Sequence, residues 1–377
     1  MRSLGPLLQS RRSGPSTASA VQGSQPIAAF ASSSPQVRSR FCGAMTTSAV
    51  PTLPTKIAFA TQGRFCGSAP AAQASSMNSI NNGLNKKKVV FIMGATGTGK
   101  SRLSVDLATH FPGEIINCDK MQVYKGLDIV TNKITDPEKQ GVPHHLLGEI
   151  EPEADFTAED FCCQAVYYIE YVLNSGHIPI IVGGSNTYIE ALVENPVFKF
   201  KSKYKCCFLW VDVALPVLHS SVSKRVDHMV HAGLVDEVRG IFVPDADYTK
   251  GIRRSIGVPE MDMYLREENK SNINEAAKQI LLESAIEEIK LNTCKLVCCQ
   301  LEKIRRLRNK KMWPIHQIDA TNVHKKSGKE ADDAWNEMVL KPCLEIVEEF
   351  LKDDEKNVEA ETNIRTMFPF KKLQVAI

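Results

Sequence analysis

One stretch of the chain has the residue types and the spacing that bind a phosphate group. Residues 94–101 read GATGTGKS, which matches the pattern G-x-x-x-x-G-K-[ST]. Glycines let backbone N–H groups turn toward phosphate oxygens, the lysine adds a positive charge, and the serine hydroxyl can bind Mg²⁺. The sequence therefore predicts a cradle for a di- or triphosphate, with Mg²⁺ on Ser101. Its residues are Gly94, Ala95, Thr96, Gly97, Thr98, Gly99, Lys100 and Ser101.

The segments on both sides of this loop support the same interpretation. Residues 89–93 are all apolar, which predicts a buried strand, and residues 102–110 continue as a helix. A helix that begins at the loop adds partial positive charge where the phosphate would bind. The alternative is a chance turn rich in glycine and threonine. It is disfavoured because every fixed position is filled and both flanks fit.

A carboxylate is expected to face the same crevice. Residues 114–119 read as a second strand that ends in Asp119. Ligands of open α/β sheets bind at the carboxyl ends of the strands, so Asp119 should lie near the cradle. A solvated acid at a strand end is the alternative. Asp212, at the end of a further apolar strand over 207–213, competes for the Mg²⁺ role.

Other polar groups along the chain carry weaker signals. His144 and His145 are adjacent and cannot share one face of a helix or strand, which favours packing in a loop over a metal site. Residues 132–135 resemble the guanine-reading N-K-x-D pattern but carry Thr135 at its last position. The basic run Lys303, Arg305, Arg306 and Arg308 is either a solvated helix end or an anion clamp, and the sequence leaves both open.

Strand and helix patterns alternate along most of the chain. A capping box at Thr157 and Asp160 predicts the start of a helix. Further helices are expected over 158–173, 186–193, 218–230, 234–242, 273–308 and 330–351, and further strands over 178–182 and 316–319. This alternation predicts an α/β, P-loop NTPase-like three-layer sandwich with a parallel sheet. The core would comprise residues 86–215 and 273–351, with a small helical insertion at 216–272 and a charged tail at 352–377.

The first 85 residues differ in composition from the rest. They are rich in serine and alanine, contain seven arginines and lysines, and contain no aspartate or glutamate. This composition is typical of a disordered transit peptide. We expect import into a plastid, with the mitochondrion as the alternative destination and a plain disordered extension as the other interpretation.

Charge and hydropathy limit the class of protein. The formal net charge is +3, but residues 86–377 hold 39 basic against 43 acidic residues, so the excess positive charge belongs to the leader. A slightly acidic body argues against a broad nucleic-acid surface. No apolar run approaches the length of a membrane span. The eleven cysteines include adjacent pairs and do not suggest a disulfide framework. We therefore expect no membrane or nucleic-acid partner. We also expect a monomer.

Eight motifs in order resemble one known family. They are residues 94–101, 116–124, 143–146, 156–161, 183–188, 225–227, 233–238 and 252–257. The chain resembles the isopentenyltransferases over residues 86–325, and within them the plant adenylate dimethylallyltransferases that start cytokinin synthesis. Transfer RNA dimethylallyltransferases share the fold and several of these motifs.

The resemblance implies a reaction and roles for particular residues. The cradle would hold the diphosphate of dimethylallyl diphosphate, and the adenine N6 amine of AMP, ADP or ATP would attack the allylic carbon. Asp119 matches the general base of the family. Arg254, with Arg253 as its near alternative, matches an arginine at the leaving diphosphate. Thr96 and Thr131 match threonines beside the same group.

The acceptor nucleotide would contact a second set of residues. This set is Asp119, Lys133, Arg253, Lys303 and Arg306. If the basic run is a phosphate clamp, ADP and ATP should be better acceptors than AMP.

Two features differ from the transfer RNA enzymes, and one differs from the plant adenylate pattern. Residues 257–260 read GVPE, as in the adenylate type, where transfer RNA enzymes usually carry an arginine. Beyond residue 325 there is only Cys343 and no histidine for a zinc finger, which eukaryotic transfer RNA enzymes append. Cys299 stands where the plant pattern has arginine. Prenylation of transfer RNA, a small-molecule kinase and a P-loop regulatory module without chemistry remain the alternatives.

Overall fold

A computed structural model describes residues 86–270 and 273–352 of the chain. The predicted leader and most of the predicted charged tail lie outside these residues. The described residues belong to one compact unit. None of the helices within these two ranges has the length and apolar composition needed to cross a membrane.

Six parallel strands form one sheet in the order β3-β2-β4-β1-β5-β6. The strands are β1 Lys87–Met93, β2 Gly113–Asn117, β3 His144–His145, β4 Ile178–Val182, β5 Tyr204–Asp212 and β6 Ile315–Asp319. In β1 the residues 89–93 are fully buried, because helices cover both faces of the sheet. This arrangement confirms the predicted parallel α/β fold. It also places β1, which leads into the phosphate cradle, in the interior of the sheet.

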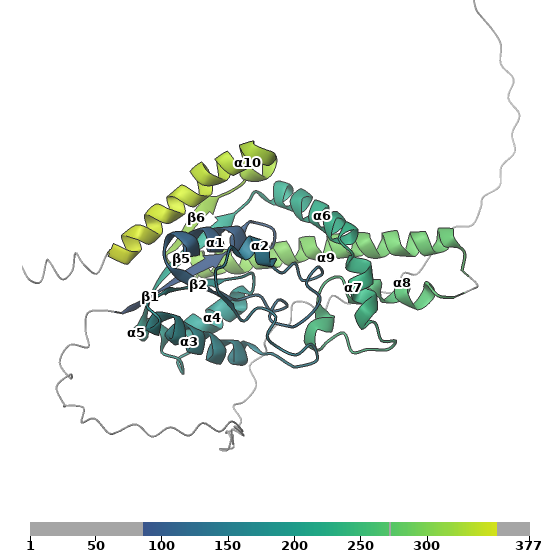
Figure 1. The fold of residues 1–377 in the computed structure, drawn as a ribbon, viewed down its shortest axis with the longest axis horizontal. Coiled ribbons are helices and arrows are strands. Elements are labelled where there is room, and N and C mark those ends of the chain that lie inside the picture. Colours follow the sequence, from purple (N-terminus) through teal and green to yellow (C-terminus); the bar gives the residue numbers. More distant parts are fainter. Residues whose placement is uncertain (1–85, 271–272, 353–377) are drawn as a thin grey trace, which may run out of the picture. The chain divides into compact units, whose positions relative to one another are not determined.

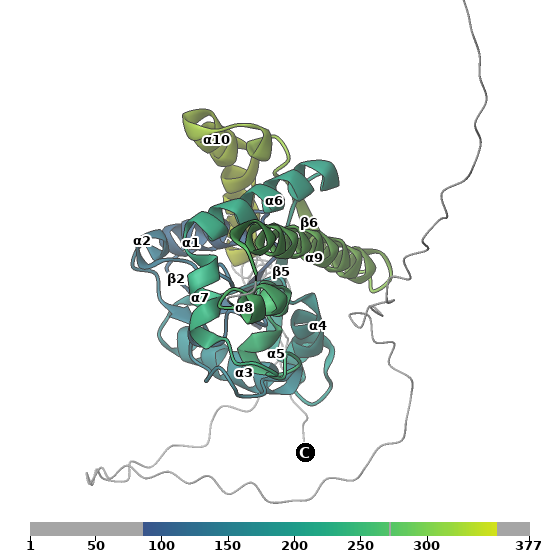
Figure 2. The same cartoon turned by 90° about the vertical axis from the view of Figure 1, so that its right-hand side faces the viewer.

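Helices cover the two faces of the sheet (Figure 1). Helix α1 (Lys100–His110) lies on the upper side in this view, and α3 (Ala158–Asn174) and α5 (Phe200–Lys203) lie on the lower side. The perpendicular view in Figure 2 keeps the same separation. The remaining α-helices are α2 Asp136–Lys139, α4 Asn186–Glu194, α6 Leu215–His231, α7 Leu234–Ile241, α8 Asp262–Glu267, α9 Glu275–Asn309 and α10 Gly328–Trp335. Short 3-10 turns occupy Gly251–Arg254, Pro259–Met261 and Val323–Lys325.

Most predicted elements appear within a few residues of their expected bounds. The capping box at Thr157 and Asp160 forms in full and begins α3. The long helix expected over 273–308 is α9, which Asn274 caps through a hydrogen bond from the Ala277 N–H. The last helix is less regular than expected. It begins as α10, passes through a π-helical turn at Asn336–Leu340, and continues as α-helix over 341–352.

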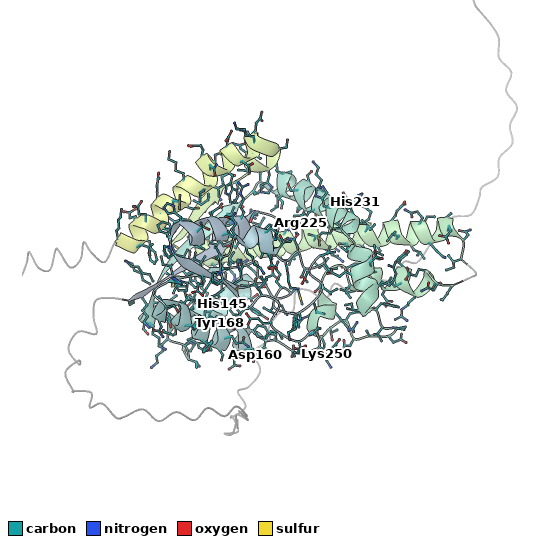
Figure 3. The ribbon with its side chains drawn as sticks, viewed as in Figure 1. His145, Asp160, Tyr168, Arg225, His231 and Lys250 are labelled. Carbon is teal, nitrogen blue, oxygen red and sulfur yellow. The ribbon has the colours of Figure 1, made fainter. Side chains whose placement is uncertain are left out.

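The prediction that His144 and His145 lie in a loop is wrong. They form the short edge strand β3, which pairs with Ile115 and Ile116 of β2. His145 Nε2 lies 2.6 Å from Glu114 Oε2, and His177 Nδ1 lies 2.6 Å from Glu114 Oε1. Figure 3 shows His145 beside Tyr168, whose ring stacks on the imidazole at a centroid distance of 4.6 Å. The buried glutamate and the ring stacking hold this pair of residues in a strand.

The C-terminal helix packs against the phosphate cradle through Trp335. Its indole ring would lie 2.8 Å from a Cβ placed on Gly99, and its Nε1 donates a hydrogen bond to Asp106 Oδ2 at 2.8 Å. The Arg102 guanidinium lies 4.7 Å from the ring centroid and pairs with Asp332 at 3.0 Å. Burial raises the pKa of Asp106, and the indole N–H opposes that shift. Trp335 therefore supports the turn from the cradle into α1.

Replacing Trp335 tests this contact. Trp335→Ala should lower the free energy of unfolding by about 3–5 kcal/mol, because it leaves a cavity in the core. Trp335→Phe should cost about 1–3 kcal/mol, because it keeps an aromatic ring but removes the hydrogen bond to Asp106. Urea denaturation measures both changes. Tyr167, which is 65% exposed, supplies the control. A loss for Trp335→Ala no larger than that for Tyr167→Ala would contradict the assigned role.

Candidate active site

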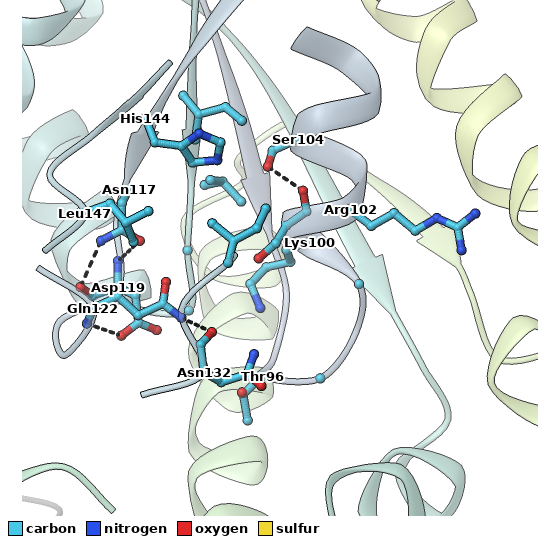
Figure 4. A pocket seen from close by; sticks show the side chains of 18 of the residues that line it. Thr96, Lys100, Arg102, Ser104, Asn117, Asp119, Gln122, Asn132, His144 and Leu147 are labelled. Carbon is cyan, nitrogen blue, oxygen red and sulfur yellow. Dashed lines mark hydrogen bonds between the residues drawn. The ribbon is translucent and has the colours of Figure 1, made fainter. Parts of the chain in front are cut away.

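A single cavity brings the cradle and Asp119 together. Its walls include Thr96, Lys100 and Ser101 from the cradle, Asp119 after β2, and Arg225 of α6. Figure 4 shows Thr96 and Lys100 across this space from Asp119 and Gln122. Further lining residues are Gly97, Gly99, Arg102, Ser104, Ile115, Asn117, Asn132, Ile134, His144, Leu147, Val182, Gly183 and Gly184. The expected placement of Asp119 beside the phosphate cradle therefore matches the structure.

Close packing requires glycine at two positions of the cradle. Gly97 has a φ of +83°, and a Cβ there would lie 2.7 Å from Val222 Cγ1 of α6. Gly94 has a φ of +155°, and a Cβ there would lie 2.7 Å from both Thr98 Oγ1 and the Val211 carbonyl oxygen. Backbone in these conformations accepts glycine without strain. The cradle thus packs closely against β5 on one side and α6 on the other.

Lys100 is held inside the cradle by its own loop. Its Nζ donates a hydrogen bond to the Ala95 carbonyl oxygen at 2.7 Å. Burial lowers the pKa of Lys100 to about 8, with Asp119 opposing the shift and Arg225 adding to it. An anion that enters the cavity would favour the charged ammonium and raise this pKa.

Hydrogen bonds from the loop after β2 orient the Asp119 carboxylate. Its Oδ1 accepts from the backbone N–H groups of Met121 at 2.9 Å and Gln122 at 3.4 Å. Its own backbone N–H donates to Asn117 Oδ1 at 3.3 Å. The other oxygen, Oδ2, would lie 3.7 Å from a Cβ on Gly184. One carboxylate oxygen is therefore fixed by the backbone, and the second can accept a proton or a hydrogen bond from a ligand.

Arg225 is a site residue to which the sequence analysis gave no role. Its Nη2 donates to Thr96 Oγ1 at 2.8 Å, and its Nε is buried without a hydrogen-bond partner among the described residues. Burial lowers its pKa, and Asp119 opposes that shift. The sequence did contain a signal for it. Arg225 falls on the helix face that carries the buried Leu218 and Val222, where an apolar residue is expected.

Arg254, the arginine predicted to contact the leaving diphosphate, is not among the described residues that line the cavity. Arg254 Nη2 donates to the Tyr124 hydroxyl at 2.9 Å, and its Nη1 lies 3.9 Å from Asp155 Oδ1. Among the described residues that line the cavity, Arg225 is the arginine that touches Thr96. The role of Arg254 at the diphosphate stays a prediction, and Arg225 is a second candidate for it.

Three other predicted site residues bond within the protein. Thr131 Oγ1 donates to the Leu127 carbonyl oxygen at 2.6 Å. Lys133 Nζ pairs with Asp128 at 2.9 Å, and Arg253 pairs with Glu153 at 3.1 Å. The Thr131 carbonyl oxygen accepts from Gln122, which lines the cavity. Their contacts with donor or acceptor stay predictions.

The basic run at the end of α9 is partly paired. Lys303 Nζ donates to Thr187 Oγ1 at 3.2 Å, and Arg306 forms an ion pair with Glu190. Burial lowers the pKa of Lys120, the residue after Asp119; Arg254 and Lys303 lower it further, and Asp155 opposes them. Arg254 and Lys303 are thus both close enough to act on Lys120. We call Lys120, Arg254 and Lys303 the basic group; it lies beside the carboxylate loop, which is the loop that carries Asp119.

The two predicted Mg²⁺ sites, one at Ser101 and one at Asp212, differ in the surroundings of their oxygen atoms. Asp212 Oδ2 accepts from Gln317 Nε2 at 2.7 Å, so β6 already engages the carboxylate of the competing Mg²⁺ candidate. Ser101 and Asp119 both line the cavity and offer oxygen atoms, which Mg²⁺ prefers. Within the two described ranges, no group of three or more histidine, cysteine, aspartate or glutamate side chains has metal-binding geometry.

The fold and this site define a P-loop protein whose cavity is suited to a phosphorylated ligand beside a carboxylate. Comparisons with known proteins agree. The family model for IPP transferase matches residues 122–201 and 194–307. The chain is 57% identical to adenylate isopentenyltransferase 5, chloroplastic, of Arabidopsis thaliana over 277 residues, which cover 73% of this chain and 83% of that protein. The chain belongs to the IPP transferase family.

Two further comparisons extend this result. The chain is 51% identical over 271 residues to adenylate isopentenyltransferase 7, mitochondrial, of Arabidopsis thaliana, covering 71% of this chain and 82% of that one. A solved structure of a eukaryotic dimethylallyltransferase acting on tRNA matches with a TM-score of 0.59 at 24% identity, covering 71% of this chain and 80% of that one. This structural similarity supports the fold.

The pKa of Lys100 leads to a pH dependence of donor binding. Below pH 8 the ammonium is charged and attracts the diphosphate; above pH 8 it is neutral in the free protein. The dissociation constant of dimethylallyl diphosphate, without acceptor, should therefore rise about tenfold between pH 7 and pH 9. Titration calorimetry at pH 7, 8 and 9 measures it. Lys100→Arg, which keeps its charge over this range, is the control. A constant affinity of the unaltered protein from pH 7 to 9 would contradict the prediction.

Proposed function

We propose that this protein is an adenylate isopentenyltransferase. It would transfer the dimethylallyl group of dimethylallyl diphosphate to N6 of an adenine nucleotide, the first step of cytokinin biosynthesis. The observation that supports this best is the shared cavity, in which an anion cradle, a carboxylate and a buried arginine converge. The named activities of the similar Arabidopsis proteins point to the same reaction.

The donor would bind with its diphosphate in the cradle. The backbone N–H groups at the start of α1 and the Lys100 ammonium stabilise its negative charge. Thr96 has a particular role at the bridging oxygen. Because Arg225 already donates to Thr96 Oγ1, the threonine can direct its own proton into the cavity. That proton and the arginine charge would stabilise the oxygen that leaves with the electron pair of the broken C–O bond.

The acceptor would approach from the side of Asp119. The N6 amine attacks C1 of the dimethylallyl group, the new C–N bond forms, and diphosphate departs. The amine proton becomes acidic as this bond forms, and Asp119 accepts it as a general base. The backbone N–H groups of Met121 and Gln122 hold one carboxylate oxygen in place, so the other is oriented toward the amine.

Mg²⁺ fits the oxygen groups of this cavity. Ser101 would hold the ion, directly or through water, which leaves the free Asp119 oxygen for the amine proton. The ion would supply positive charge to the departing diphosphate.

The basic group beside the carboxylate loop is a candidate site for the acceptor phosphates. Burial, Arg254 and Lys303 lower the pKa of Lys120 while Asp155 opposes them, so an anion bound beside Lys120 would be stabilised by these three side chains. Arg306 is engaged by Glu190, which makes Lys303 the better candidate within the basic run. A longer phosphate chain would reach more of these charges, so ADP and ATP should exceed AMP as acceptors.

The compartment follows from the leader and from the relatives. The leader has the composition of a transit peptide, and similar proteins are named chloroplastic or mitochondrial. We propose import into plastids, with mitochondria as the alternative destination.

One assay tests the activity and the acceptor class together. Labelled dimethylallyl diphosphate is incubated with the protein and AMP, ADP, ATP or transfer RNA. Label should appear on the free nucleotides, with the lowest KM for ADP and ATP, and Lys303→Ala should raise the KM for ADP and ATP more than that for AMP. Transfer of label to transfer RNA alone would identify the rival acceptor. ATP consumption without a prenyl donor would instead identify a kinase.

A further inference from the structure

Gln300 of α9 bridges two walls of the active-site cavity. Its side-chain oxygen accepts the backbone N–H of Thr96 at 2.8 Å, and its side-chain nitrogen donates to the Gly184 carbonyl oxygen at 3.1 Å. Its own carbonyl oxygen accepts from Asn186 Nδ2 at 3.3 Å. The residue is buried, with 7% of its surface exposed. Each end of the amide group therefore has a specific partner.

The bridge joins the donor side of the cavity to the base side. Thr96 belongs to the phosphate cradle, and Gly184 follows β4 and lies against the Asp119 loop. A Cβ on Gly184 would lie 2.3 Å from Gln300 Nε2 and 3.7 Å from Asp119 Oδ2. The neighbouring Gly183 is packed even more tightly, since a Cβ there would lie 2.1 Å from the Cys118 carbonyl oxygen. Because the Gly184 end of the bridge is so tightly packed, a change in the length or polarity of the bridge would move Thr96.

Thr96 is held from two directions. Gln300 of α9 fixes its backbone N–H, and Arg225 of α6 fixes its side-chain oxygen. Because Gln300 occupies the backbone N–H, the hydroxyl proton is the donor that Thr96 can offer to a ligand in the cavity. The direction of that proton depends on the backbone orientation that Gln300 sets.

We infer that Gln300 is a positioning residue for the transfer reaction. Through its hydrogen bond with the backbone N–H, it orients the Thr96 hydroxyl toward the leaving oxygen of the diphosphate. The inference rests on the proposed function, because the leaving group is that of the prenyl donor. It assigns no contact between Gln300 and the substrates.

The expected effect falls on kcat more than on the KM for the donor. The remaining cradle groups, among them Lys100, still bind the diphosphate, whereas the Thr96 hydroxyl acts when the C–O bond breaks. Gln300→Met keeps the approximate volume and removes both side-chain hydrogen bonds. It should lower kcat by about 10–100-fold, since small misplacements of a reacting group cost factors of this size.

A double-mutant cycle separates positioning from general support of the fold. Gln300→Met is measured in the natural protein and in the Thr96→Ala variant, with dimethylallyl diphosphate and ADP as substrates. If Gln300 acts through the Thr96 hydroxyl, its replacement should change kcat by no more than about 3-fold in the Thr96→Ala background. An equal loss in both backgrounds would overturn the inference.

Two further variants serve as controls for the double-mutant cycle. Thr293→Val changes another residue of α9 with 7% exposure, whose hydroxyl donates to the Ile289 carbonyl oxygen of the same helix, and should leave kcat unchanged. Gln300→Asn keeps a neutral amide of shorter reach that can still accept from the Thr96 N–H, and it should retain a higher kcat than Gln300→Met, even if the methionine variant folds poorly. A kcat for Gln300→Asn equal to or below that of Gln300→Met would count against the inference. Absence of prenyl transfer by the unaltered protein would instead overturn the proposed function.

Discussion

Two positive groups and one carboxylate, brought together in a single cavity, are the constraint on which the site depends. Lys100 and Arg225 act on each other and on Asp119, and burial lowers the pKa of both basic groups. Such an arrangement has an excess of positive charge that water solvates poorly. A diphosphate supplies the missing negative charge. The site is therefore prepared for an anion before any acceptor enters.

Elements distant in sequence hold this arrangement in place. Arg225 comes from α6, Gln300 from α9 and Trp335 from the last helix, and each contacts the cradle or the turn into α1. Glycines permit the close approach, because the Gly97 and Gly99 positions face Val222 and the Trp335 ring directly. The parallel sheet then presents the cradle and the Asp119 loop at the same edge. Precise placement of a few groups thus depends on the packing of most of the chain.

The sequence predicted the parts of the site that depend on local pattern. The cradle, the strand before it, and the carboxylate at the end of β2 follow from residue spacing and from the general geometry of parallel sheets. It did not predict Arg225 or Gln300, because both reach the cradle from helices more than 100 residues away. The β3 strand was also missed, since its two histidines depend on the buried Glu114 for their place. Tertiary contacts, which local sequence patterns do not reveal, determine the positions of these residues and of β3.

The central claim is that the Asp119 carboxylate removes the amine proton beside a bound diphosphate. The most direct measurement compares Asp119→Asn with the unaltered protein for both donor binding and transfer to ADP. The account predicts that kcat falls by about 10²–10⁴-fold, as expected for loss of a general base, while dimethylallyl diphosphate still binds. A kcat for Asp119→Asn within a few-fold of the unaltered protein would contradict it.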